Sequence, residues 1–148
     1  MRLERRFADE IVAHAREGRA TQEEAEICGV LLGKDGAISE CMRIRNIAEQ
    51  PRIRYMMDPQ GLFQLMRRLD ETGMELIAIY HSHPHTRAYP SETDRGNAHD
   101  EEGRPLWPGV VYIICSLEHP AQPVLNAFRL FPDHAEDEVL ELVERDAA

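Results

Sequence analysis

The chain has 148 residues and a formal net charge of −10, from 27 Asp and Glu against 17 Lys and Arg. This length suits one domain with a sizeable core, so we expect residues 1–148 to form a single domain that needs no disulfide framework to fold. An acidic chain repels phosphate backbones, which disfavours nucleic acid as a partner. The exception would be a local patch made by the arginines at positions 43, 45, 52 and 54; the alternative is that these arginines lie on exposed strand faces.

The three cysteines, Cys28, Cys41 and Cys115, are odd in number and form no C-x-x-C pair. Neither a disulfide scaffold nor a cysteine zinc site is therefore expected. The longest apolar run, residues 110–115, is far shorter than the roughly 18 residues of a membrane span, and the N-terminal residues lack an apolar signal core. We expect a cytoplasmic protein that does not bind membranes.

Helix and strand signals begin close to the N-terminus. Residues 6–17 predict a helix, because their apolar side chains recur on one stripe and Gly18 follows as a stop. Two strands are expected next, over residues 27–32 and 38–44. The Asp35-Gly36 pair between them predicts a hairpin turn, since both residues tolerate positive φ.

A third strand is expected over residues 52–56, and the clearest helix follows it. Asp58 can cap this helix, a proline suits its first position, leucine and methionine recur at helical spacing, and Gly73 ends it. Residues 76–80 are nearly all apolar and run directly into His81-Ser82-His83-Pro84. This segment predicts a buried central strand that ends at the proline.

The second half of the chain predicts two more strands, over residues 110–115 and 124–130, and a short helix capped by Ser91. A last helix is expected from Asp133 onward, because its early acidic residues suit the positive end of a helix dipole. The order of elements predicts an α/β fold in which one mixed β-sheet is flanked by helices. A regular βαβ winding does not fit this order.

The strongest chemical signal is the pair of histidines at the end of the predicted central strand. Side chains alternate along a strand, so His81 and His83 point to the same side and Ser82 points to the other. Two imidazoles and one carboxylate leave a fourth position open for water, the arrangement of a catalytic zinc site. Asp94 is the nearest plausible carboxylate.

Each part of this pattern has an ordinary structural reading. A His-x-His pair also occurs at exposed strand ends, and Ser91 to Asp94 matches a helix capping box. A two-histidine, one-carboxylate iron oxygenase would use similar ligands, although the sequence lacks a jelly-roll pattern. A zinc deaminase would need a P-C-x-x-C motif, which is absent.

The joint spacing of three motifs resembles a known family, the JAMM (MPN+) metallopeptidases. Glu26 opens an early E-I-C-G segment, His81-Ser82-His83-Pro84 follows, and after six residues comes Ser91-Glu92-Thr93-Asp94. All signature positions of the family are present, and the likeness covers about residues 5–131. It implies the JAMM/MPN (cytidine deaminase-like) architecture.

The resemblance also implies a role for each matching residue. His81, His83 and Asp94 would hold Zn2+, Glu26 would act as general base and then general acid, and Ser91 would stabilise the oxyanion. Family members hydrolyse bonds after the Gly-Gly tail of ubiquitin or of ubiquitin-like proteins. The compact chain is most similar to the bacterial branch, which implies a ubiquitin-like sulfur-carrier protein as the partner; the alternative is a non-catalytic MPN scaffold that keeps its metal site.

The other reactive side chains have no place in the family pattern. We interpret five histidines as surface or loop residues, with His85 nearest to the site: His14, His85, His99, His119 and His134. Cys28 lies one strand period from Glu26, where small packing is a better explanation than a nucleophile. The charged loop over residues 99–108 is either a substrate flap or a disordered surface loop.

Overall fold

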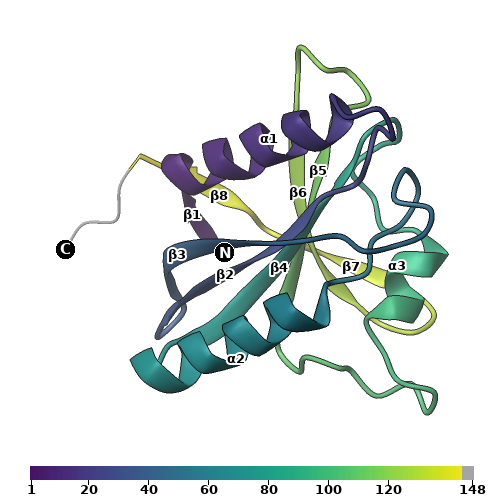
Figure 1. The fold of residues 1–148 in the computed structure, drawn as a ribbon. Helices are drawn as coiled ribbons and strands as arrows, with labels where there is room; N and C mark the ends of the chain where they lie inside the picture. Colours follow the sequence, from purple (N-terminus) through teal and green to yellow (C-terminus); the bar gives the residue numbers. More distant parts are fainter. Residues whose placement is uncertain (145–148) are drawn as a thin grey trace.

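The computed structural model describes residues 1–144, which form three helices and eight strands (Figure 1). Among these residues, no helix combines the length and the apolar character that crossing a membrane requires. In chain order the elements are β1 (Arg2–Glu4), α1 (Arg5–Arg19), β2 (Cys28–Lys34), β3 (Ala37–Ile44), α2 (Pro59–Thr72), β4 (Glu75–His83), α3 (Glu92–Asn97), β5 (Val111–Ser116), β6 (Val124–Leu130), β7 (Ala135–Glu138) and β8 (Glu141–Val143).

Six of the strands form one mixed sheet in the order β3-β2-β4-β5-β6-β7. The central pair, β4 and β5, is parallel, and the other neighbours in this sheet are antiparallel. Figure 1 shows α1 above this sheet and α2 below it. The predicted α/β fold, with a mixed sheet flanked by helices, is confirmed.

Alternation along the central strand divides the core between the two faces of the sheet. Tyr80 packs on the α1 side with Phe7 and Ile11, whereas Ile79 packs on the α2 side with Leu65. Burying each large apolar side chain contributes roughly 1.5–3 kcal/mol. The sheet is thus held from both sides, and β4 becomes a rigid support for the residues at its end.

The predicted first helix is confirmed, although it is longer than expected. It includes Gly18, the residue that the sequence predicts as its stop. Gly18 is buried, and a Cβ atom at this position would overlap the side chain of Ile27 and the carbonyl group of Ala25. The glycine is therefore required for close approach of the helix to the chain that leads into β2.

The turn and cap signals are confirmed. Asp35 and Gly36 have φ of 53° and 79°, as the hairpin between β2 and β3 requires. The Asp58 carboxylate accepts a hydrogen bond from the amide of Gln60 at 3.0 Å, and Gly73 ends α2 with φ of 72°. These local signals position β3, α2 and β4 in sequence.

The prediction of a strand over residues 52–56 is wrong. Residues 51–53 form a turn, and the chain then runs without regular structure until Met57 makes a single antiparallel bridge with Asn46. The Arg54 carbonyl and the Met56 amide bond to the side chain of Asn46 instead of to a neighbouring strand, whereas the Met56 carbonyl accepts from the Ile47 amide. A side chain thus replaces the ladder that a strand would need.

The prediction of a last helix from Asp133 onward is also wrong. Residues 135–138 form β7, which pairs with β6, and residues 141–143 form β8, which pairs in parallel with β1. The acidic side chains lie on an edge strand, where charge discourages pairing with other chains. The end of the predicted helix, residues 145–148, lies outside the described residues.

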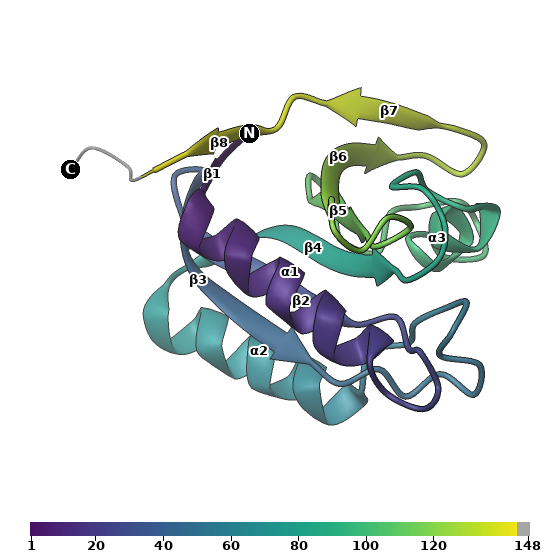
Figure 2. The same ribbon diagram turned by 90° about the horizontal axis from the view of Figure 1, so that it is seen from above.

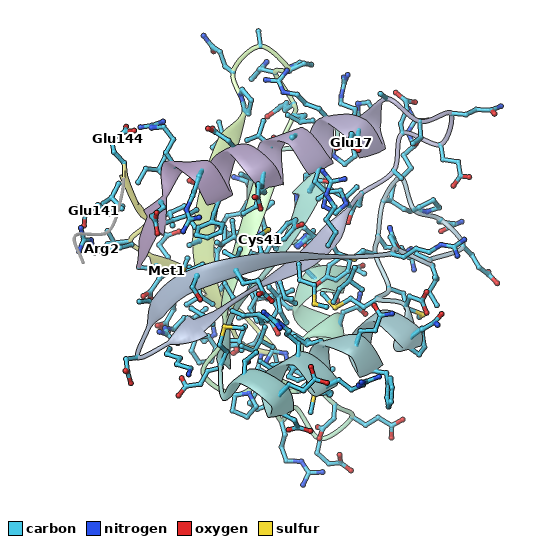
Figure 3. All side chains as sticks on the ribbon, turned by 60° about the vertical axis from the view of Figure 1, so that its left-hand side comes forward. Met1, Arg2, Glu17, Cys41, Glu141 and Glu144 are labelled. Carbon is cyan, nitrogen blue, oxygen red and sulfur yellow. The ribbon has the colours of Figure 1, made fainter. Side chains whose placement is uncertain are left out.

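The short β1–β8 sheet brings the two ends of the described chain together. Figure 3 shows Met1, Arg2, Glu141 and Glu144 grouped at one end of the molecule, and Arg2 is the register partner of Glu141. Arg5 Nε donates to the Glu144 carboxylate at 2.8 Å. Because both side chains are more than half exposed, this ion pair adds little stability.

Candidate active site

Two histidines at the end of β4 and an aspartate in the first turn of α3 meet at one point. The Nε2 atoms of His81 and His83 are 3.1 Å apart. Asp94 Oδ2 lies 3.2 Å from the first of these atoms and 3.1 Å from the second. All three residues are buried. The structure therefore brings together the three residues that the sequence predicted as metal ligands.

The spacing of these three atoms fits a zinc ion. Zinc binds imidazole nitrogen and carboxylate oxygen at about 2.0–2.1 Å in a tetrahedron, so its ligand atoms lie about 3.3 Å from one another. The observed distances of 3.1, 3.2 and 3.1 Å are close to this value. Three protein ligands would leave the fourth position of the tetrahedron for water or substrate.

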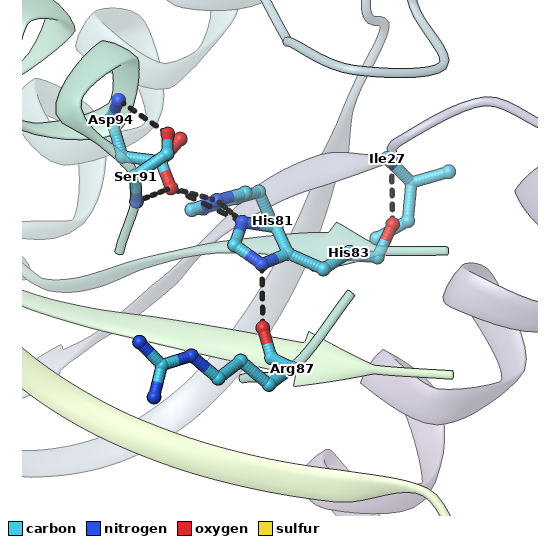
Figure 4. Close-up of polar contacts among 7 residues, drawn as sticks. Ile27, His81, His83, Arg87, Ser91 and Asp94 are labelled. Atoms are coloured by element: carbon cyan, nitrogen blue, oxygen red, sulfur yellow. Dashed lines mark hydrogen bonds and ion pairs between the residues drawn. The ribbon is translucent and has the colours of Figure 1, made fainter. Parts of the chain in front are cut away.

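The sheet and the helix position these ligands through further hydrogen bonds (Figure 4). His83 Nδ1 bonds to the carbonyl oxygen of Arg87 at 2.9 Å, which leaves Nε2 free to face the site. The Ser91 amide donates to Asp94 Oδ2 at 2.9 Å, and the Asp94 amide donates to Ser91 Oγ at 3.0 Å. The predicted capping box is thus present, and it orients the carboxylate toward the histidines.

Tyr55 covers one face of His81. Their rings are stacked with centroids 4.6 Å apart, and Tyr55 belongs to the irregular segment between β3 and α2. The Nδ1 atom of His81 is buried and has no hydrogen-bond partner among residues 1–144. The stacked ring therefore restrains the imidazole where a hydrogen bond does not. The residue pattern carried no signal for this contact.

The electrostatics of the cluster favour the ionised form of Asp94 and the neutral form of His81. Burial alone would raise the pKa of Asp94, but the two histidines and the Ser91 amide hold it well below its usual range. Burial lowers the pKa of His81. Burial also opposes the charged form of His83, but its bonds to Asp94 and to the Arg87 carbonyl raise its pKa overall. An ionised aspartate and a neutral His81 are ready to bind a cation.

Glu26 lies just before β2 and lines a cleft that His83 also lines. The cleft has a volume of about 300 Å³, and Glu26, His83 and Ser91 are among the residues that line it. Only 4% of Glu26 is exposed, and its Oε1 atom has no hydrogen-bond partner among the described residues. Burial is the main reason that its pKa is raised to about 8. Such a carboxyl group is suited to exchange protons near neutral pH.

Ser82 faces away from the histidines, as strand alternation predicts. Its Oγ atom accepts a hydrogen bond from the amide of Ile27 at 2.9 Å, and its own amide donates to the Ile27 carbonyl at 3.1 Å. Figure 4 shows Ile27 on the opposite side of the histidines from Asp94. Ser82 therefore joins the strand that carries the histidines to the residue next to Glu26.

The positions of His85 and Cys28 agree with the predictions from the sequence, and that of His14 does not. His85 lines the cleft beside Glu26, and its ring is 3.2 Å from the Glu24 carboxylate. His14 is different from our expectation of a surface residue, because it is half-buried on α1 and bonds to the Tyr80 hydroxyl at 2.8 Å. Cys28 is fully buried, and burial raises the pKa of its thiol to about 12, which suits packing.

The loop over residues 99–108 has a defined structure. Asp100 Oδ1 accepts from the amides of Glu102 and Arg104, both at 2.9 Å, and His99 forms a bridge with Pro105. The interpretation as a disordered surface loop is therefore wrong. A role as a substrate flap stays a prediction.

A mixed sheet carries two histidines that meet an aspartate in a group that could hold a metal ion, and the cleft beside His83 contains a buried glutamate. Residues 4–131 match the family described as prokaryotic homologs of the JAB domain. The chain belongs to this family, and the resemblance to JAMM/MPN proteins is confirmed.

Named relatives and a solved structure agree with this assignment. The chain is 39% identical over 110 residues to a desampylase of Haloferax volcanii, which covers 73% of this chain and 74% of that protein. It is 29% identical over 136 residues to the CysO-cysteine peptidase of Mycobacterium tuberculosis, with 91% and 86% covered. The solution structure of a Desulfitobacterium hafniense protein matches with a TM-score of 0.79 at 29% identity, covering 97% of this chain and 93% of that one.

Proposed function

We propose that this protein is a zinc-dependent peptidase that hydrolyses the bond after the C-terminal Gly-Gly of a ubiquitin-like sulfur-carrier protein. The observation that carries the proposal is the meeting of His81, His83 and Asp94 within 3.2 Å of one another, with His83 lining the same cleft as Glu26. Relatives named as a desampylase and a CysO-cysteine peptidase support this class of substrate. The three cysteines of the chain are unpaired, which suits a reducing cytoplasm.

In this proposal the chain's own residues divide the work of proton transfer and charge stabilisation. Zinc, when bound to the three ligands, would polarise the scissile carbonyl and lower the pKa of water. Glu26 would take a proton from the attacking water and then deliver it to the leaving amine. Burial raises the pKa of this carboxyl group to about 8 in the metal-free protein, which supports a role in which it carries a proton between two steps.

The Ser91 hydroxyl can still donate a hydrogen bond to the substrate. Its Oγ atom accepts from the Asp94 amide, so the hydroxyl proton is available to a developing oxyanion in the cleft. We propose this donation in addition to its capping role. Removing one such donor typically costs about 10²-fold or more in rate.

The residues that line the cleft beside His83 support the proposed substrate. Its walls bring Ile53, Pro84 and Ser91 close to Glu26 and His83. An extended tail can bind there through its backbone, and glycine places no β-carbon against these walls. A Gly-Gly tail therefore suits the positions nearest the metal.

An intact-mass assay tests the proposal. The zinc-loaded protein is incubated with a ubiquitin-like carrier that bears a short C-terminal extension, beside the same carrier with its final glycine changed to valine. We expect cleavage directly after Gly-Gly and strong loss with the valine carrier. A folded protein that ends in bulky residues is the control. Equal cutting of all three proteins, or cutting of none, would contradict carrier processing.

A further inference from the structure

Asn46, which lies just after the end of β3, bonds to the backbone of Glu26 from outside the cleft. We propose that Asn46 is a positioning residue, which holds Glu26 on one side of the site and Tyr55 on the other. The proposal rests on the function proposed above for Glu26. Asn46 is half-buried and does not line the cleft that contains Glu26. Its influence must therefore pass through the residues that it binds.

The Asn46 side chain makes four hydrogen bonds, which use both of its N–H donors and both acceptor positions of its oxygen. Asn46 Nδ2 donates to the carbonyl oxygen of Glu26 at 3.0 Å and to that of Arg54 at 3.1 Å. Asn46 Oδ1 accepts from the amides of Ala48 at 3.0 Å and Met56 at 2.9 Å. Few side chains make four bonds to the backbone of four residues, so this arrangement fixes the segment closely.

Two of these bonds lie on either side of Tyr55. The bond to the Arg54 carbonyl holds the chain before the tyrosine, and the bond from the Met56 amide holds the chain after it. A backbone bond from the Ile47 amide to the Met56 carbonyl, at 2.8 Å, reinforces the second contact. Tyr55 is thereby fixed in the position from which its ring stacks on His81.

A third bond acts on Glu26, whose direction depends on its backbone. The carboxylate Oε1 atom has no hydrogen-bond partner in residues 1–144, so side-chain bonding at this atom does not aim it. The backbone is held instead, since the Glu26 amide donates to the Pro51 carbonyl at 2.7 Å and its carbonyl accepts from Asn46. Pro51 belongs to the same segment that Asn46 organises. Loss of Asn46 would therefore loosen both anchors of Glu26.

A simpler explanation is that Asn46 only stabilises the segment 47–56. Substitutions separate the two explanations. Asn46→Ala removes all four bonds. Asn46→Asp keeps an oxygen for the amides of Ala48 and Met56 but has no donor for the carbonyls of Glu26 and Arg54. Thr72→Ala is the matched control: Thr72 ends α2, where it donates to the Arg68 carbonyl at 2.7 Å and accepts from the Met74 amide at 3.1 Å, away from the histidine end of β4.

The first measurement is steady-state kinetics on zinc-loaded protein, per bound zinc, with a Gly-Gly-linked carrier. We expect kcat to fall about 10- to 100-fold in both Asn46 variants, because a small misplacement of a catalytic group has an effect of this size. KM and zinc content should change less than about threefold. Thr72→Ala should lower the melting temperature but leave kcat unchanged. Equal loss of kcat in Thr72→Ala, or unchanged kcat in Asn46→Ala, would overturn the proposal.

The second measurement is amide hydrogen exchange, which needs no substrate. We expect faster exchange at the amides of Glu26, Ala48 and Met56 in Asn46→Ala, and at the Glu26 amide but not the Met56 amide in Asn46→Asp. Unchanged exchange at Glu26 in both variants would refute the positioning role. If wild-type protein cleaves no carrier while the exchange pattern is as expected, the proposed substrate fails and the positioning of Glu26 stands.

Discussion

Ser82 on β4 and Ile27, the residue before β2, are joined by two hydrogen bonds, one through the Ser82 hydroxyl and one through its amide. Both residues are buried, and they connect the histidine-bearing end of β4 to the entry of β2. The serine between the two histidines therefore has a structural function of its own. It keeps the proposed base and the proposed ligands in one register.

Replacing Ser82 with alanine should destabilise the protein by about 1–3 kcal/mol, because the Ile27 amide would stay buried without its acceptor. Thermal unfolding measures the change, and the zinc content of folded protein should stay the same. Ser39→Ala is the control, since this exposed serine on β3 has no buried partner group and should change stability by less than about 0.5 kcal/mol. Equal losses of stability in the two variants would show that the bond between Ser82 and Ile27 does not contribute more than an exposed serine does.

Zinc binding should depend on the three residues of the cluster and not on the histidine beside it. We expect one zinc per chain in the wild type and almost none in His81→Ala or His83→Ala, because each of these changes leaves two protein ligands; Asp94→Asn should weaken binding because a neutral amide oxygen replaces the carboxylate. His85→Ala should retain its zinc. Elemental analysis after dialysis makes the measurement, and full zinc content in His81→Ala and His83→Ala would refute the ligand assignment.

Changing Glu26 to glutamine should separate metal binding from catalysis. The amide can still hold water but cannot accept its proton, so we expect full zinc content and nearly complete loss of hydrolysis. Paired measurements of zinc content and product formation test this. Loss of the metal together with activity would mean that Glu26 is a ligand.

Glu26 should also make the stability of the metal-free protein depend on pH. Its pKa is raised from 4.5 to about 8, mainly by burial, so the folded state keeps a proton that the unfolded state releases. This group therefore causes stability to fall as pH rises from about 4.5 to about 8. The loss is up to about 4 kcal/mol between pH 5 and pH 8.

Thermal unfolding of metal-free wild type and Glu26→Gln over this range measures the effect. The two proteins should differ little at pH 5, and the variant should be the more stable at pH 8. If the difference between them does not grow with pH, the raised pKa is refuted.

The sequence predicted the elements whose signals are local. Asp58 and Gly73 mark the ends of α2, and Asp35-Gly36 marks the hairpin, because capping and turn geometry depend on few neighbouring residues. The prediction of a strand over residues 52–56 failed because the structure of this segment depends on a residue outside it. Its backbone is bonded by Asn46, and no local pattern shows that one side chain will replace a strand partner.

The prediction of a last helix failed because its segment pairs with strands distant in sequence. The pairing of β8 with β1 depends on residues at the other end of the chain, and the acidic pattern suits a helix start as well as an edge strand. At the site, alternation placed His81 and His83 together. Glu26 could be chosen from 27 acidic residues only by family resemblance, since its burial and its cleft arise from tertiary packing.

The β1–β8 contact also has a consequence for folding kinetics. Arg5 and Glu144 are 139 positions apart, and the adjoining ladder has three residue pairs. Closing so long a loop costs entropy that only a few bonds offset, so this contact should form after the six-stranded sheet. For the same reason we expect β8 to detach before β4 during local opening, because β4 is paired on both sides.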